Sequence, residues 1–208
     1  MAQGTASGGL AVDAPPHIYR ASDLAVAFPA GWAVRRFDEH AFFRALGGHH
    51  KLSAVDFVAL APPGHRGALV EVKSYLPRGR HAPGLPPPDL LADKLARKRR
   101  DTLAALERIG AHYVGRGWWR WLVRPGLRRV RDREARSGGT VPGLDYDYRF
   151  FPLLAEAAAE SAYVIVLEGP SPLIGAYRAR VAAQLSARGV RAAVVGAADL
   201  RAALSEAS

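Results

Sequence analysis

The chain contains no cysteine among its 208 residues. Disulfide scaffolds, thiolate metal sites and cysteine nucleophiles are therefore excluded, and a reducing compartment fits this composition. No run of the sequence approaches the ~20 apolar residues that a membrane-spanning helix needs. The N-terminal sequence MAQGTASGGLAVDAPPHIYR also lacks the basic and apolar regions of a signal peptide. We therefore expect a cytoplasmic protein without membrane contact.

Lysine is scarce, because only 4 of the 29 basic residues are lysine and the others are arginine. The formal net charge is +10, and the whole excess lies in residues 78–136, which hold 16 Lys+Arg against 6 Asp+Glu. The rest of the chain carries 13 residues of each sign. A localised positive field favours a polyanionic partner such as nucleic acid. Solvated surface arginines in an arginine-rich composition are the alternative explanation.

Hydrophobic periodicity and turn residues predict an α/β fold, with a central mixed β-sheet flanked by helices. A β-α-β-α order near the C-terminus predicts parallel strands there. The predicted strands are residues 24–28, 32–37, 52–60, 68–76, 163–167 and 190–195, and the predicted helices are 39–46, 89–109, 151–159, 171–188 and 198–204. Gly110 and Gly189 are the expected stops of two of these helices.

The chain is most simply divided into a flexible N-terminal tail, residues 1–16, and one α/β domain, residues 17–205. Within the domain, residues 113–148 mix tryptophan, arginine and glycine without a sustained period. We expect an irregular basic insertion there, with a short helix near residues 127–136.

Three polar residues stand out on the two strands of a predicted hairpin. Glu71 and Lys73 are two residues apart, so they emerge on the same face of their strand. If Leu60 pairs with Gly67 across the turn, Asp56 lies opposite Glu71, where Cβ atoms are ~5 Å apart. Two carboxylates so close repel each other unless a cation compensates them. This spacing predicts a Mg²⁺ site, with Mn²⁺ as a substitute.

Lysine at position 73 is informative in a chain that otherwise uses arginine. A compact ammonium can orient or deprotonate a water molecule, whereas a guanidinium does not readily release its proton. The alternative is a solvent-facing charge pair, since Glu-x-Lys is a common tripeptide and such pairs contribute little energy.

The segments VDFVAL and LVEVKSY together resemble the core of the PD-(D/E)xK superfamily, the restriction-endonuclease-like nucleases. The segment KLARKRRDTLAALERI resembles a set of uncharacterised bacterial proteins with a similar core. The resemblance implies that Asp56 and Glu71 bind metal and that Lys73 is catalytic. The Val72 carbonyl would complete the coordination, and Glu39 matches an accessory acid of some members. Val55, and not the proline of the motif, precedes Asp56.

Further residues are candidates for substrate contact. Lys94 and Lys98 are one helical turn apart and could face the scissile phosphate, although a solvated helix face explains them equally well. The tryptophans near residue 120 could stack on bases, or could be packing anchors of the core. The candidate nucleic-acid contacts are Arg97, Arg99, Arg100, Trp118, Trp119 and Arg120.

Together these observations predict a metal-dependent phosphodiesterase acting on DNA, with RNA as a second candidate substrate. A catalytically silent protein that binds nucleic acid or a protein partner on the same fold is the alternative. Dimerisation is common among such nucleases, and nothing in the sequence requires it.

Overall fold

The main sheet of the protein is mixed and has five strands in the order β3-β4-β5-β6-β7. Strands β3 to β5 pair antiparallel, and β6 and β7 continue the sheet in parallel with β5. A separate antiparallel hairpin is formed by β1 and β2. The strands are β1 His17–Ala21, β2 Leu24–Phe28, β3 Ala33–Arg36, β4 Phe57–Ala61, β5 Arg66–Ser74, β6 Ala162–Glu168 and β7 Ala193–Val195. The computed structural model describes residues 17–41, 43–44, 52–61, 66–77, 84–114, 147–170 and 172–206.

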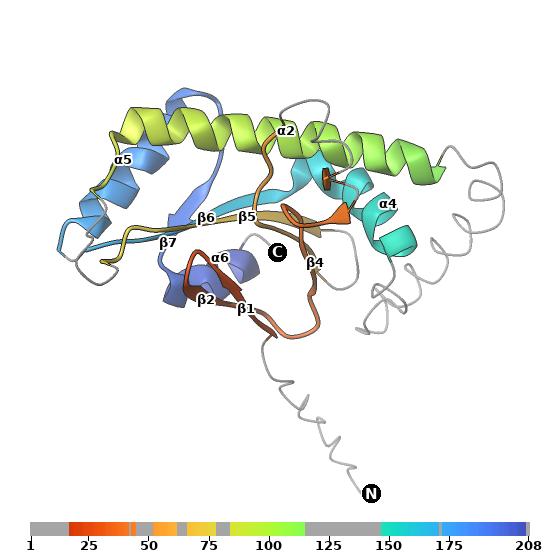
Figure 1. Cartoon of the computed structure of the whole chain (residues 1–208), viewed down its shortest axis with the longest axis horizontal. Coiled ribbons are helices and arrows are strands. Elements are labelled where there is room, and N and C mark those ends of the chain that lie inside the picture. The colour runs from red at the N-terminus through yellow and green to blue at the C-terminus, as the bar shows by residue number, and fades with distance from the viewer. Residues whose placement is uncertain are drawn as a thin grey trace, which may run out of the picture.

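Helices cover one face of this sheet, and the β1–β2 hairpin with a short helix covers the other (Figure 1). The first face packs under the long helix α2 and under α4 and α5, whereas the second packs on the hairpin and α6. The helices are α2 Pro88–Val114, α4 Asp147–Ala157, α5 Ile174–Ala187 and α6 Leu200–Glu206, with short 3-10 turns η2 Ala158–Glu160 and η3 Ala197–Asp199. The predicted α/β class with a mixed sheet is therefore confirmed.

Strand β5 lies at the centre of the sheet, and its side chains alternate between the two apolar layers. Leu69 belongs to the layer under α2, while Val70 and Val72 belong to the layer over the hairpin. Alternation therefore directs Glu71 and Lys73 toward α2. The sheet thus delivers two charged groups into the interior between itself and its longest helix.

The predicted register of the hairpin is confirmed, because Leu60 pairs with Gly67. The first strand of this hairpin, however, begins at Phe57 and not at residue 52. The preceding segment bonds to α2 instead of to a strand. The Ser53 amide donates to Asp101, and the Val55 amide donates to the Thr102 hydroxyl, at 3.1 Å in both cases. These side chains satisfy the backbone groups that a longer strand would have paired.

Gly110 does not end α2, contrary to the sequence-based prediction, because the helix continues to Val114. Gly110 lies where α2 crosses α4, and a Cβ at this position would lie 2.6 Å from the Cβ of Ala155. The glycine therefore permits close helix packing. Gly189 does act as predicted, since its left-handed φ of 71° follows the end of α5.

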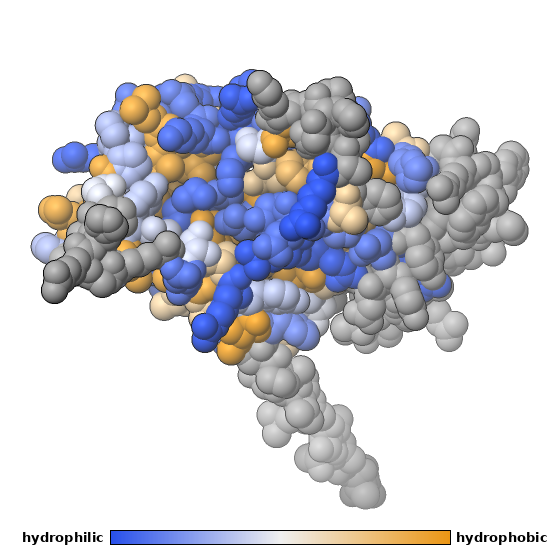
Figure 2. All heavy atoms as spheres, in the orientation of Figure 1, coloured by the Kyte–Doolittle hydropathy of each residue, from blue (hydrophilic) through white to orange (hydrophobic). Residues whose placement is uncertain are grey.

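Several predicted features lie outside the described residues: the tail 1–16, residues 42, 45 and 46 of the helix 39–46, and most of the insertion 113–148, including the helix 127–136. In the part of the chain that is described, no helix is long and apolar enough to cross a bilayer. On the face seen in Figure 2, apolar residues form separate patches among hydrophilic ones.

Replacing Gly110 with alanine is expected to lower the free energy of unfolding by about 1–3 kcal/mol, which is a typical cost of over-packing. Gly175 in α5 is the matched control, since a Cβ there meets nothing within 4 Å. Alanine at that helical position should leave stability unchanged or raise it by up to about 1 kcal/mol. Urea unfolding of both variants beside the parent measures the difference, and equal effects would contradict the close α2–α4 contact.

Candidate functional site

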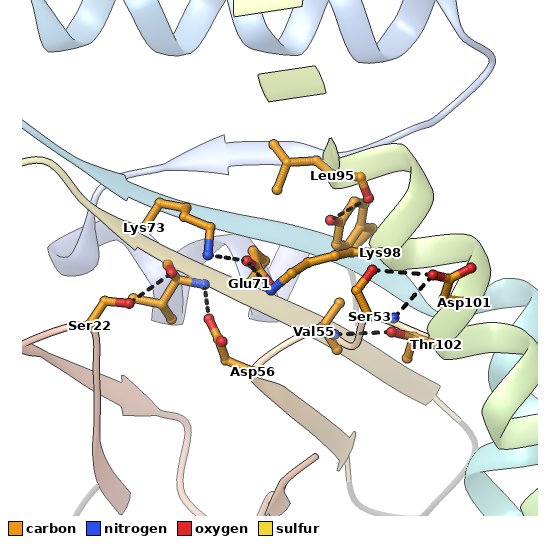
Figure 3. A network of polar contacts seen from close by, with 12 residues as sticks. Ser22, Ser53, Val55, Asp56, Glu71, Lys73, Leu95, Lys98, Asp101 and Thr102 are labelled. Atoms are coloured by element: carbon orange, nitrogen blue, oxygen red, sulfur yellow. Dashed lines mark hydrogen bonds and ion pairs between the residues drawn. The ribbon is translucent and has the colours of Figure 1, made fainter. Parts of the chain in front are cut away.

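The candidate site is built around Glu71, whose side chain is 0% exposed beneath α2. The Lys73 Nζ lies 2.6 Å from Glu71 Oε1. From α2 above, the Lys98 Nζ donates to both Glu71 oxygens, at 2.8 and 3.1 Å (Figure 3). One carboxylate is therefore held between two ammonium groups, one from its own strand and one from the covering helix.

Burial of Glu71 has an electrostatic cost that the two lysines oppose. Removal from water disfavours the charged form of a carboxyl group. Burial raises the pKa of Glu71, and the nearby Asp56 raises it further, while Lys73 and Lys98 lower it. Burial and Asp56 outweigh the lysines, so the pKa of Glu71 stays above its usual range. A further cation at this carboxylate would relieve the remaining cost.

Lys73 behaves in the opposite sense. Burial lowers the pKa of Lys73, but the Glu71 carboxylate raises it by charge and by hydrogen bonding, and Asp56 adds to this rise. The resulting pKa lies above the usual lysine value. Lys73 is therefore an ammonium at neutral pH, and in this arrangement it supplies positive charge and hydrogen-bond donors.

Asp56 lies beside a part of β5 that β4 does not reach. Because β4 begins at Phe57, no strand residue in the described part of the chain pairs with the Val72 peptide groups on that side. The Val72 N–H donates to Asp56 Oδ2 at 2.6 Å, and the Val72 carbonyl accepts from the Ser22 hydroxyl at 3.3 Å. Two side chains thus replace the missing strand, and one of them is a predicted metal ligand.

A third acid, Asp38, lies in the same electrostatic neighbourhood and was not selected from the sequence. Burial raises the pKa of Asp38, and Asp56 raises it further. Its Oδ1 is buried without a hydrogen bond, at 3.6 Å from the Arg36 Nε. The predicted accessory acid Glu39 instead pairs with Arg36 at 3.1 Å and is 50% exposed. Asp38, and not its neighbour Glu39, therefore has the stronger link to Asp56.

The other predicted contact residues separate in the structure. Lys98 reaches the site, but Lys94, one turn earlier on α2, is exposed. Arg97 is exposed and lies 3.7 Å from Asp101. Arg100 is exposed as well, whereas Arg99 has a buried Nε. The residues Trp118, Trp119 and Arg120 lie outside the described residues.

The ligand chemistry of this site fits a hard divalent cation. Mg²⁺ takes oxygen ligands and is commonly held by one or two carboxylates with water. Asp56 has one oxygen engaged with Val72, and the two oxygens of Glu71 accept from lysines that can be displaced. Among the described residues, no group of three or more His, Cys, Asp or Glu side chains could hold a metal ion. The fit is therefore to a two-carboxylate site.

Comparison of the chain with protein-family models, with curated proteins and with solved structures found no match. The functional argument therefore depends on the geometry and chemistry of the residues themselves.

Replacing Lys98 with methionine is expected to make folding stability more dependent on pH. Burial and Asp56 raise the pKa of Glu71, and Lys98 is one of two lysines that oppose this rise. Its loss raises the folded-state pKa further above the unfolded value. The folded state then binds more protons than the unfolded state between the two pKa values, so the unfolding free energy falls as the pH rises through that window. The deficit of Lys98→Met relative to the parent should therefore grow as the pH rises above the usual pKa of a glutamate.

Urea unfolding at several pH values measures this deficit. Lys94→Met is the matched control, because Lys94 is exposed on the same helix. A deficit that does not change with pH would show that Lys98 is not coupled to a titrating carboxyl group in this range.

Proposed function

We propose that the protein is a divalent-metal-dependent nuclease that hydrolyses phosphodiester bonds in DNA, with a restriction-endonuclease-like core. The observation that carries this proposal is the meeting of Glu71, Lys73 and Asp56 at one region of β5. Two acids that can share a cation, with an ammonium beside them, are a set suited to metal-assisted hydrolysis of a phosphodiester. RNA is the second candidate substrate.

The roles of the residues follow from their chemistry. Bound Mg²⁺ would supply activation of a water molecule and stabilisation of charge on the phosphate. Asp56 and Glu71 would hold the ion through carboxylate oxygens, together with the Val72 carbonyl. Lys73, as an ammonium, would orient the attacking water through a hydrogen bond or neutralise the negative charge that develops on a phosphate oxygen.

Lys98 sets a condition for cation binding in this proposal. Its Nζ donates to both oxygens of Glu71, so an incoming ion must replace at least one of these bonds. The Lys98 side chain is 24% exposed and can turn toward solvent, whereas Glu71 cannot leave the interior. The Lys98 ammonium would thus compensate Glu71 in the metal-free protein and would be displaced by a bound metal ion. The displaced ammonium could then form an ion pair with a phosphate group of the substrate.

The charge distribution of the chain supports an anionic substrate. The excess of 16 Lys+Arg over 6 Asp+Glu in residues 78–136 includes the cations of α2, which lies directly over the site. Nucleic acid carries closely spaced phosphates and binds such basic regions by releasing counterions. The carboxylate site and the basic region would therefore bind the same nucleic-acid chain.

A catalytically silent nucleic-acid-binding or partner-binding protein is the second candidate function. The observation that favours it is the pairing of Glu71 with two lysines, which already compensates much of its charge without a metal ion. Such a protein would bind DNA with strong salt dependence. It would not cut any strand when Mg²⁺ or Mn²⁺ is added.

Cleavage of DNA by the full chain is expected to require Mg²⁺ or Mn²⁺ and to stop in EDTA. Lys73→Ala should lower the cleavage rate at least about 100-fold while largely sparing DNA binding, since a positioned catalytic group contributes about that much. Asp56→Asn should also abolish cleavage, because it removes a ligand charge. Gel assays on single- and double-stranded DNA and RNA measure these rates.

Arg201→Ala is the control for this series, because it removes an exposed arginine from α6, which covers the other face of the sheet. Cutting that persists in EDTA, or in Asp56→Asn, would overturn the catalytic assignment. Salt-dependent binding without metal-dependent cutting on any of these substrates would establish the second candidate function in its place.

Binding of Mn²⁺ to the DNA-free protein tests the exchange at Glu71 separately. Glu71→Gln should abolish binding, whereas Lys98→Met should tighten it by about tenfold or more, because a charge-assisted hydrogen bond of ~1.5–3 kcal/mol no longer competes. Lys94→Met should bind as the parent does. Titration calorimetry or electron paramagnetic resonance of Mn²⁺ reports the affinities, and weaker binding by Lys98→Met would refute the competition.

A further inference from the structure

A hollow of about 610 Å³ lies at the start of β6, and none of the carboxylate-site residues lines it. Its wall is formed by α2, by the turn that precedes β6, and by the segment that leads into β7. Two arginines, Arg99 and Arg191, line it together with Ser161 and Tyr163. This hollow brings together two cations that are 92 residues apart in the sequence (191 minus 99).

Arg99 is held there with an unsatisfied donor. Its Nε is buried and has no hydrogen-bond partner. Within the described residues, neither the partly buried Arg99 nor the exposed Arg191 forms an ion pair. The partly buried Arg35 and Arg178, by contrast, both pair with a carboxylate. A buried donor without a partner costs about 1–3 kcal/mol. An anion in the hollow would remove this cost if the guanidinium turned so that Nε faced it.

Glu160 is the acidic residue that lines the hollow, and in the described structure it does not pair with Arg99 or Arg191. Glu160 is exposed. The two arginines and this glutamate give the hollow a formal charge of +1. The Ser161 hydroxyl is already used, because it donates to the Ala157 carbonyl at 3.0 Å. The guanidinium groups are therefore the groups offered to a ligand.

The other residues that line the hollow are mainly alanines, with Val164 and Tyr163. The Tyr163 hydroxyl is turned away from solvent and donates to the Leu95 carbonyl at 3.1 Å. A volume of this size lies within the range of small-molecule sites, about 300–1,000 Å³. A ligand for the hollow would therefore combine an anionic group with a small organic body.

The hollow and the carboxylate site lie on the same side of the sheet and share the electrostatic environment of Tyr163. Burial raises the pKa of Tyr163 well above its usual range; among the nearby charges, Glu71 raises it and Arg99 lowers it. Lys98 and Arg99 are adjacent on α2, yet Lys98 bonds to Glu71 and Arg99 lines the hollow. Two consecutive residues of α2 thus point to two different places, one to the carboxylate site and one to the hollow.

We propose that this hollow is a phosphate-binding site for a small phosphorylated molecule, with Arg99 and Arg191 as the residues that hold the phosphate. A guanidinium presents several donors in a planar fork that matches phosphate oxygens. The site is independent of the metal at Glu71 and of the proposed nuclease activity.

Binding is tested on the full-length protein in EDTA, so that no divalent cation contributes. The probes are inorganic phosphate, a nucleoside monophosphate and the same nucleoside without phosphate, each titrated by calorimetry. Inorganic phosphate and the monophosphate should bind with Kd near or below about 1 mM, and the nucleoside should not. Tighter binding of the monophosphate than of inorganic phosphate would assign the apolar wall to the organic part, and equal binding would assign the site to the phosphate alone.

Arg99→Gln and Arg191→Gln should each weaken phosphate binding by about tenfold or more, as expected for loss of charge-assisted hydrogen bonds. Arg100→Gln is the matched control, because it removes an exposed arginine adjacent to Arg99. Arg99→Gln should also unfold at the same or a higher temperature than the parent in the absence of ligand, since it removes a buried donor without a partner. A purely structural role would instead lower this temperature.

Three results would overturn the proposal: no binding of either phosphate probe, equal weakening by Arg99→Gln and Arg100→Gln, or destabilisation by Arg99→Gln without a change in affinity. The phosphate titrations do not measure DNA cleavage. A negative result in these titrations would therefore leave the nuclease proposal unaffected, and a negative nuclease assay would leave the phosphate site unaffected.

Discussion

The buried carboxylate of Glu71 requires nearby positive charge, and the elements around it are arranged to supply that charge. A charge removed from water must find compensation nearby, or its group becomes neutral. Here the compensation comes from Lys73 on the same strand and from Lys98 on the helix above. Helix α2 thus has an electrostatic connection to the sheet in addition to its apolar contacts. Any ligand that enters the site must take over the compensation that these lysines provide.

The late start of β4, at Phe57, is the second determinant of the site, because it leaves part of the β5 backbone without a strand partner in the middle of the sheet. An unpaired edge inside a fold leaves polar groups that need partners. Asp56 and Ser22 provide these partners for Val72, one from the start of β4 and one from the hairpin on the other face. The same late start places the Asp56 carboxyl group near Glu71. A gap in the hydrogen-bond ladder is therefore what makes room for a second acid.

The parts of this arrangement that could be predicted from the sequence are those set by local rules. The register between Leu60 and Gly67 follows from strand alternation and the turn residues, and so does the shared face of Glu71 and Lys73. The contact of Lys98 with Glu71 depends on how α2 lies across the sheet, which spacing within the helix does not determine. Gly110 was misread because helix packing, and not helix termination, requires a glycine there. Strand β1 was missed because Ala21 is its one buried residue, which leaves almost no hydrophobic pattern.

The hairpin turn at Ser22 and Asp23 has left-handed backbone angles, with φ of 48° and 64°. Such a turn restricts the direction of the hairpin tip. The Ser22 hydroxyl in this turn donates to the carbonyl of Val72, the residue between Glu71 and Lys73. Through the Ser22 hydroxyl, the N-terminal hairpin helps to set the tilt of the Val72–Lys73 peptide plane, which lies between the two functional side chains. The first described segment of the chain is accordingly a structural part of a centre whose chemistry is carried entirely by later residues.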